Sequence, residues 1–334
     1  MKKLLYEVSI IRPLVILLLV VMHSFTMYDG GWPLPEGIHA VTAYAWLVNF
    51  ISGFRIETIA LIAGYVFAYQ SLDLGRRYKL GEFALKKFKR LIIPCLFFSI
   101  CYYFLFQRNT YELLSLTFFI KLSSGFGHLW FLPMLFWCFI VLWVIDNYKL
   151  YSKFLLIVLA AVSLIPIPSM PLGFSRVFHF AFYCVLGYHI YRYKNQILGI
   201  KNLKWVCLLV YLVLVIVYNS VPSAGSLAIN LTHRMMKLGL ASSGIFALYL
   251  FTCNFIYKTP SYKPKEWILK SSGLCYGVYI YHQFVLKYIY YYTPIPDHVG
   301  TYWLPWVGLL ITLIISITGT SITLRTKLGR FLIG

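Results

Sequence analysis

The chain has 334 residues, of which 60% are hydrophobic and only 12% are charged. Soluble proteins carry about 25% charged residues, so this composition excludes an ordinary soluble enzyme. The net charge of +20 could indicate a nucleic-acid-binding protein, but Lys and Arg occur in short clusters between apolar runs, as in membrane proteins. We therefore expect an all-α polytopic membrane protein that lies in a lipid bilayer and binds no nucleic acid.

Ten stretches are long and apolar enough for membrane-spanning helices, which need about 20 mostly apolar residues. The fifth is the weakest because Pro166, Pro168 and Pro171 shorten it. We expect residues 1–334 to form a single transmembrane domain without a separate soluble domain. The predicted spans are approximately 11–28, 43–70, 91–107, 128–146, 154–170, 175–192, 205–221, 236–257, 273–292 and 303–323.

The distribution of cations predicts the orientation of these spans. If the N-terminus is cytoplasmic, most of the 30 Lys and Arg residues fall in cytoplasmic segments, as the positive-inside rule requires. An even number of spans then places both termini in the cytoplasm. The cations that this topology assigns to the outer side are Arg108, Lys121, Arg176, Arg234 and Lys237.

The seven cysteines lie in or beside apolar segments. They have neither CxxC spacing nor the spacing of zinc ligands with nearby histidines. We expect them to be buried apolar residues, with no disulfide framework and no metal site.

The first apolar stretch contains an arginine and a histidine, Arg12 and His23, separated by ten nonpolar residues. On a helix these side chains are about 20° apart around the axis and roughly 16.5 Å apart along it. Pro13 suggests that the helix starts there, which would put Arg12 at a helix N-terminus and His23 about halfway through the bilayer. Ionisable residues inside spans are usually functional. The alternative is that Arg12 is a membrane anchor and His23 is a packing residue.

The second stretch contains Arg55 and Glu57, which are two residues apart and so do not face each other on a helix. Their partners should come from other spans, either in a functional site or in an ion pair that fixes helix packing. Ala63 and Gly64 permit a close backbone approach, by another helix or by a thin substrate such as a pantetheine arm.

Further polar residues occur inside later spans or near their ends. Arg90 follows a basic linker that either faces anionic lipid or holds the phosphates of a donor. A histidine at a span end more often packs than reacts, so a structural role stays open for the others. These candidates are His128 and Trp130 in the fourth span, Arg176 at the start of the sixth, and Tyr281 and His282 in the ninth.

Taken together in this order, these motifs resemble the acyltransferase-3 family of bacterial membrane acyltransferases that modify surface glycans. The resemblance covers nearly the whole chain and departs from the family pattern in AlaGly at 63–64, where SerGly is usual, and at Phe284. It rests on Arg-x10-His at 12–23, PheArg at 54–55 with AlaGly at 63–64, ArgLeuIleIlePro at 90–94, GlyHisLeuTrpPheLeu at 127–132 and TyrIleTyrHisGln at 279–283.

The resemblance implies transfer of an acyl group, with acetyl expected, from acyl-CoA to a hydroxyl of a cell-surface glycan or its lipid-linked precursor. It also implies a bacterial cytoplasmic membrane location, with acyl-CoA as co-substrate and no permanently bound cofactor. A histidine with an ordinary pKa near 6.5 suits a general base. The expected roles are His23 as base, Arg55 as oxyanion stabiliser, Glu57 as partner of either, Arg12 and Arg90 as donor ligands, and His128, Trp130, Tyr281, His282 and Arg176 as substrate-lining residues.

Other functions remain open from the sequence. The same buried charges would serve the proton relay of a proton-coupled transporter or flippase of a glycan or lipid-linked sugar. A noncatalytic membrane scaffold would tolerate loss of His23. Within acyl transfer, an acyl-histidine relay is a second possible mechanism beside direct attack by the hydroxyl.

Overall fold

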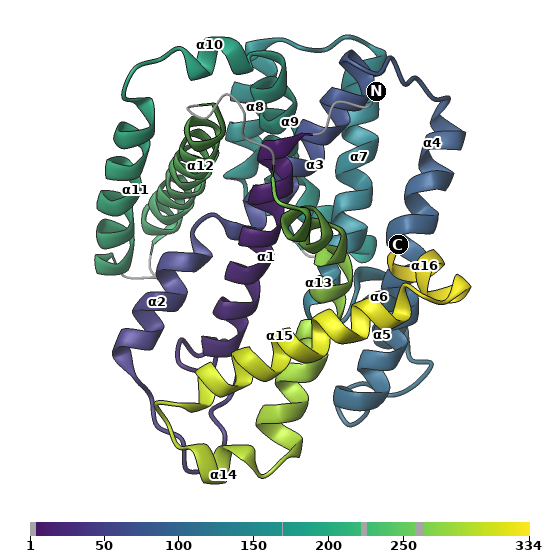
Figure 1. Ribbon diagram of the computed structural model, residues 1–334, viewed down its shortest axis with the longest axis vertical. Helices are drawn as coiled ribbons and strands as arrows, with labels where there is room; N and C mark the ends of the chain where they lie inside the picture. Colours follow the sequence, from purple (N-terminus) through teal and green to yellow (C-terminus); the bar gives the residue numbers. More distant parts are fainter. Residues whose placement is uncertain (1–4, 169, 222–225, 258–263) are drawn as a thin grey trace. The chain divides into compact units, whose positions relative to one another are not determined.

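A computed structural model describes residues 5–168, 170–221, 226–257 and 264–334, and these residues form an all-α protein without strands (Figure 1). The prediction of an all-α polytopic membrane protein is confirmed. Lys2, Lys3, Lys258 and Lys263, which the predicted topology places inside, lie outside the described residues. Two compact units are present: residues 1–59 with 200–327 and Gly334, and residues 60–199 with 328–333. The prediction of one domain over 1–334 stays a prediction.

The first unit packs around α1. Helix α1 contacts α2, α12, α13 and α15, while α13 packs against α15 and α11 against α12. Its buried core includes Phe25, Leu286, Tyr290 and Leu304. The helices of this unit are α1 (Tyr6–Phe25), α2 (Thr42–Ser52), the first turn of α3 (Arg55–Leu72), α11 (Leu203–Ser220), α12 (Leu227–Tyr257), α13 (Glu266–Tyr292), α14 (Ile295–Val299) and α15 (Leu304–Thr323).

The second unit contains the rest of α3 and the helices that follow it. Helices α7 and α8 both pack against α9, and α5 packs against α6. Its elements are α4 (Leu80–Lys87), the π-helical turn η1 (Phe88–Ile92), α5 (Ile93–Phe106), α6 (Leu116–Ser124), η2 (Gly127–Trp130), α7 (Phe131–Asn147), α8 (Lys153–Ser163), η3 (Pro171–Arg176), α9 (Val177–Arg192), α10 (Lys194–Leu198) and most of α16 (Lys327–Ile333).

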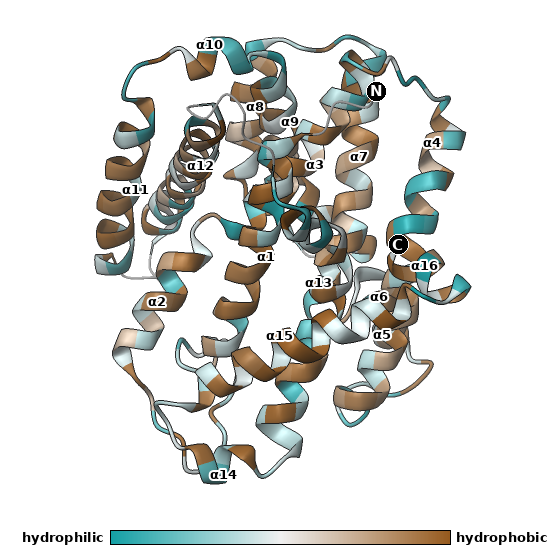
Figure 2. Cartoon of the chain, viewed as in Figure 1, coloured by the Kyte–Doolittle hydropathy of each residue, from teal (hydrophilic) through white to brown (hydrophobic). Residues whose placement is uncertain are grey.

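Each predicted span contains a helix, and seven helical segments among the described residues are long and apolar enough to cross a membrane. The predicted span 43–70 is divided into α2 and α3 at residues 53–54. Helix α8 ends at Ser163, before the three prolines, so the span predicted to reach residue 170 is too long. Exposed apolar side chains such as Ile216 of α11 and Leu310 of α15 suit contact with lipid, and the ribbons of both helices are largely brown in Figure 2. The number of crossings and the side of the termini stay predictions.

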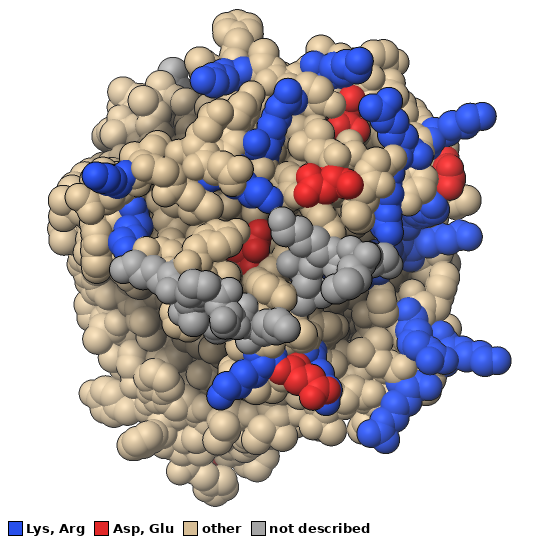
Figure 3. All heavy atoms as spheres, turned by 45° about the horizontal axis from the view of Figure 1, so that its top comes forward, with Lys and Arg blue, Asp and Glu red and all other residues tan. Residues whose placement is uncertain are grey.

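Figure 3 shows the face that is seen when the top of Figure 1 is turned forward. Blue Lys and Arg side chains are more common there than red Asp and Glu. In the second unit the C-terminal ends of α3 and α7 lie toward this top (Figure 1), and the predicted topology assigns the loops after them to the cytoplasm.

The prediction that Pro13 starts the first helix is wrong. Helix α1 begins at Tyr6 and Pro13 lies inside it, so Arg12 is not at a helix N-terminus. A membrane helix tolerates an internal proline because nearby polar groups compensate for the lost hydrogen bond. Pro13 lies one turn after Ser9 and has no N–H to donate to the Ser9 carbonyl. Helix α1 ends at Phe25, so His23 lies in its last turn, and its depth in the bilayer stays a prediction.

Two glycines bring α3 and α9 into close backbone contact within the second unit. A Cβ atom at Gly64 would lie 1.7 Å from the Cys184 carbonyl oxygen, and one at Gly187 would lie 2.0 Å from the Leu61 carbonyl oxygen. The sequence left a helix or a thin substrate as alternatives for the neighbour of Gly64. The structure places a helix there.

We expect Gly64→Ala to destabilise the protein because the obstacle is backbone, which cannot rotate away. Overpacking of a tight interior typically costs about 1–3 kcal/mol, and a backbone clash on this scale belongs at the upper end. Thermal unfolding in detergent measures the effect, with Gly81→Ala as the control, since a Cβ at Gly81 meets nothing within 4 Å. Equal unfolding temperatures for Gly64→Ala and Gly81→Ala would contradict the close contact.

Candidate active site

Two histidines that lie 259 residues apart in the sequence meet between α1 and α13. His282 Nε2 lies 3.2 Å from His23 Nδ1, and the ring centroids are 4.9 Å apart. His23 Nδ1 also lies 3.0 Å from the Leu19 carbonyl oxygen, and His282 Nδ1 lies 2.6 Å from the Tyr279 carbonyl oxygen. His282 is fully buried, whereas His23 is partly buried.

These contacts assign the protons on both rings. A carbonyl oxygen only accepts hydrogen bonds, so His282 Nδ1 carries a proton and Nε2 of the neutral ring is an acceptor. His23 Nδ1 therefore faces two acceptors, the Leu19 carbonyl and His282 Nε2, and must be the protonated nitrogen of His23. In neutral His23 this leaves the lone pair on Nε2. Such a histidine can take a proton at Nε2 while Nδ1–H stays hydrogen-bonded, as a general base requires.

The loop that follows α1 covers His23. Trp32 stacks on the His23 ring, with centroids 5.9 Å apart and an interplanar angle of 29°. Lys287 Nζ lies 5.5 Å from the centre of the Trp32 ring. The Gly31 and Trp32 amides both donate to the Thr26 carbonyl, at 3.1 and 3.3 Å, which turns the loop back over the helix end. Sequence reasoning missed Trp32, because an aromatic residue in a loop carries no periodic signal.

Arg55 and Glu57 are both buried in the first turn of α3. The buried Arg55 Nε has no hydrogen-bond partner within the described residues. Arg55 interacts electrostatically with Glu57 and with Asp29, and the second of these partners lies in the loop after α1 rather than in another span. Partial loss of solvation raises the pKa of the Asp29 carboxyl, while hydrogen bonds from backbone amides and the charge of Arg55 oppose that shift.

A second group of predicted site residues meets within the other unit. The Arg176 guanidinium lies 4.1 Å from the centre of the Trp130 ring, which also contacts Phe180 at a centroid distance of 5.7 Å. His128 is buried two residues before Trp130 in η2, with its ring 6.3 Å from that of Tyr102. Arg176 and Trp130 therefore form a cation–π contact at the start of α9.

The remaining predicted residues have separate environments. Tyr281 shares a hydrogen bond with Thr323 of α15 at 2.9 Å and so contacts that helix. Arg12 lies on α1 close enough to Cys275 of α13 to interact electrostatically. Arg90 is exposed within the π-helical turn η1, and π-turns are frequent at functional sites. Within the described ranges, three or more His, Cys, Asp or Glu side chains are nowhere grouped as metal ligands.

The family model described as an acyltransferase domain, that of the acyltransferase-3 family, matches residues 5–325. The chain belongs to the acyltransferase-3 family. The predicted family is thus confirmed, and the protein is a multi-pass membrane acyltransferase. Searches of the curated proteins and of the solved structures found no match.

Proposed function

We propose that this acyltransferase moves an acyl group, with acetyl as the first candidate, from acyl-CoA to a hydroxyl of a bacterial cell-surface glycan or its lipid-linked precursor. The location would be the bacterial cytoplasmic membrane. The observation that carries the proposal is the His23–His282 pair, in which hydrogen bonds donated by Nδ1–H of His23 leave Nε2 as its basic nitrogen.

In the proposed reaction His23 Nε2 takes the proton of the acceptor hydroxyl as its oxygen attacks the thioester carbonyl. A carbon–oxygen bond forms, and the carbonyl electron pair moves onto oxygen. When the tetrahedral intermediate collapses, the carbon–sulfur bond breaks, and the leaving thiolate takes the proton from His23. The products are an ester and coenzyme A, and His23 returns to its neutral state.

The oxyanion of the intermediate needs donors or positive charge in a site from which water is excluded. Arg55 is our candidate, because it is buried and its Nε lacks a hydrogen-bond partner within the described residues. Glu57, in the same turn, interacts with the charge of Arg55 and would hold the guanidinium in place.

Arg12 would bind the donor below the base. Arg12 lies on α1 eleven residues before His23, a rise of roughly 16.5 Å on a regular helix. An extended pantetheine arm could therefore run along α1 from Arg12 to His23. Arg90 would be a second donor ligand. We assign acceptor-lining roles to His128, Trp130 and Arg176 of the second unit and to Tyr281 and His282 of the first unit, as the family resemblance implies.

Inside-out membrane vesicles test the proposal. Vesicles that contain the protein and the native glycan pool receive isotope-labelled acetyl-CoA, and the label is followed into alkali-labile esters. We expect ester formation that depends on the protein. Vesicles without the protein provide the control, and other short acyl-CoAs test the identity of the acyl group.

Transport is the competing outcome of this experiment. A proton-coupled transporter would leave all labelled acyl-CoAs intact and would move glycan in response to a proton gradient. Absence of labelled ester with every acyl-CoA, together with gradient-driven glycan movement, would overturn acyl transfer from CoA.

We expect His282→Ala to lower kcat/KM about tenfold, the loss of roughly one hydrogen bond. His282 Nε2 accepts from Nδ1–H of His23 and so stabilises His23 when it is protonated. Removal of His282 should move the acidic limb of the profile of kcat/KM against pH to lower pH. His282→Gln, which offers an acceptor oxygen, should reverse part of this shift. A pH profile that falls uniformly without shifting would indicate that His282 only packs.

A further inference from the structure

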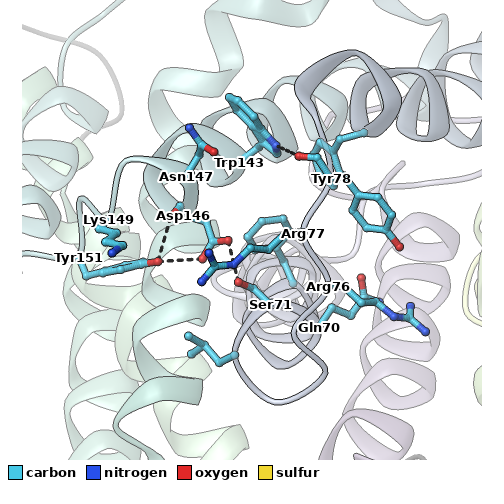
Figure 4. Close-up of a pocket in the computed structure, with 13 residues that line it drawn as sticks. Gln70, Ser71, Arg76, Arg77, Tyr78, Trp143, Asp146, Asn147, Lys149 and Tyr151 are labelled. Carbon is cyan, nitrogen blue, oxygen red and sulfur yellow. Dashed lines mark hydrogen bonds between the residues drawn. The ribbon is translucent and has the colours of Figure 1, made fainter.

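A cavity of about 200 Å³ lies within the second unit, at the C-terminal ends of α3 and α7 (Figure 4). The loop from α3 to α4 and the loop after α7 complete its wall. The predicted topology assigns both loops to the cytoplasmic side. The side chains that matter for the cavity are those of Arg76, Arg77, Tyr78, Trp143, Asp146 and Lys149.

The cavity has an excess of positive charge. Its cations are Arg76, Arg77 and Lys149, all exposed, and none of them forms an ion pair within the part of the chain that the structure describes. Its one lining carboxylate, Asp146, accepts hydrogen bonds from three hydroxyl groups. An anionic ligand would therefore meet three available cations and a carboxylate that is already hydrogen-bonded.

Those three hydroxyls hold Asp146 from three different elements. Ser71 of α3 donates at 2.7 Å, Tyr151 of the loop after α7 at 2.9 Å, and Tyr188 of α9 at 3.0 Å. The ring of Tyr188 is stacked on that of Tyr151, with centroids 5.3 Å apart. Asp146 thus links three elements around the cavity. Its carboxylate acts mainly as this structural link rather than as an exposed negative charge.

Hydrogen bonds to backbone carbonyls fix both loops that carry the cations. Trp143 Nε1 donates to the Tyr78 carbonyl at 2.9 Å, and the Arg76 amide donates to the Gln70 carbonyl at 3.0 Å. At the end of α7, Leu150 N donates to the Ile145 carbonyl at 2.9 Å while Lys149 has a φ of 56°. This left-handed position at a helix end usually belongs to glycine, so a lysine occupies it at some cost in strain.

The other walls suit a planar, polar ligand. Tyr78, Trp143 and Phe83 supply aromatic surface, and Gln70 and Asn147 supply amide donors and acceptors. Cations with aromatic and amide groups recognise a nucleotide: phosphates pair with Arg and Lys, and a base stacks on rings. Ligand pockets are usually about 300–1,000 Å³, so a cavity of this size fits one end of a longer ligand.

We propose that this cavity binds the phosphate-bearing nucleotide end of acyl-CoA, with Arg76, Arg77 and Lys149 as phosphate ligands. The inference rests on the proposed function, and it adds a donor site to the residues that the sequence assigned to the donor, Arg12 and Arg90. Anionic lipid headgroups carry the same phosphate chemistry, so the test separates the two sources.

The test compares two donors with the purified protein in nanodiscs. Acetyl-CoA carries the nucleotide, and acetyl-pantetheine lacks it but presents the same thioester. In the double variant Arg76→Gln/Arg77→Gln we expect the ratio of kcat/KM for acetyl-CoA to that for acetyl-pantetheine to fall at least tenfold. The matched control is Lys79→Gln, which removes a cation from the same loop but does not line the cavity, and its ratio should stay at the wild-type value.

Increasing salt should lower the wild-type ratio, because exposed charges are screened, and should change the ratio of the double variant less. An unchanged ratio in the double variant, with normal acetyl-CoA kinetics, would overturn the nucleotide site while leaving acyl transfer intact. Equal losses for both donors would also overturn it, because they would indicate a structural effect. If the double variant lost bound phosphatidylglycerol without a change in the ratio of kcat/KM for the two donors, the cavity would bind a lipid headgroup instead of the nucleotide.

Failure of the proposed function has a different signature. If the wild-type protein transfers acetyl from neither donor, calorimetry with adenosine 3′,5′-bisphosphate still tests the cavity. Binding by the wild type and by Lys79→Gln, weakened at least tenfold in Arg76→Gln/Arg77→Gln, would support a nucleotide site. Equal binding, or no binding, by all three proteins would overturn it.

Discussion

Replacement of His23 by alanine is expected to lower kcat/KM for acyl transfer by about 10²–10⁴-fold, the usual contribution of a general base. A sugar hydroxyl is a poor nucleophile at neutral pH, so the reaction depends on a group that takes its proton during attack. Helix α1 should survive the change, because His23 lies in its last turn and is only partly buried. Initial rates with labelled acyl-CoA and the glycan acceptor measure the effect.

His39→Ala and His298→Ala are matched controls for this result. Both histidines are exposed, and we expect both variants to keep wild-type rates. Size-exclusion profiles and unfolding temperatures should agree among all three variants. A folded His23→Ala protein with wild-type kcat/KM would remove His23 from the chemistry.

Arg55→Met is expected to lower kcat by about 10²–10³-fold, the range found when one oxyanion donor is removed. The effect should appear in kcat more than in KM, because the oxyanion exists only in the transition state and the intermediate. Steady-state kinetics with purified protein in nanodiscs provide the measurement.

A structural role for Arg55 would have a different signature. Methionine leaves Asp29 and Glu57 without the charge of Arg55, which interacts with both of them. Stability should therefore fall as well, since a carboxylate that loses its partner is destabilising. Adding Asp29→Asn to Arg55→Met should restore part of the stability but none of the activity. Recovery of kcat in that double variant would contradict a role for Arg55 in oxyanion stabilisation.

The helical architecture could be predicted from the sequence because apolar runs of membrane length are a strong local signal. Local signals also gave wrong helix boundaries at particular residues. Pro13 commonly starts helices, yet α1 begins seven residues earlier, because a bilayer penalises every unpaired backbone group and so favours continued helix. At the other end of the chain, α13 extends back to Glu266, well before the predicted start at 273.

The sequence indicated most of the residues of the candidate site but not which of them lie next to one another. His23 and His282 each stood out as a titratable group in an apolar segment, but only tertiary packing places their rings 4.9 Å apart. Trp32 covers His23 from a loop, and Asp29 interacts with Arg55 from the same loop. Loop residues follow no helical period, so no spacing in the sequence connects them to the site.

The most direct test of His23 as the general base is a search for acyl-enzyme in the absence of acceptor. Purified protein is incubated with labelled acetyl-CoA alone, quenched rapidly and digested, and the peptide containing His23 is examined by mass spectrometry. Direct transfer with His23 as base predicts an unmodified peptide and release of coenzyme A only after the glycan is added. Acetyl on His23 that forms without acceptor and disappears when the glycan is added would contradict it, because His23 would then carry the acyl group rather than the proton.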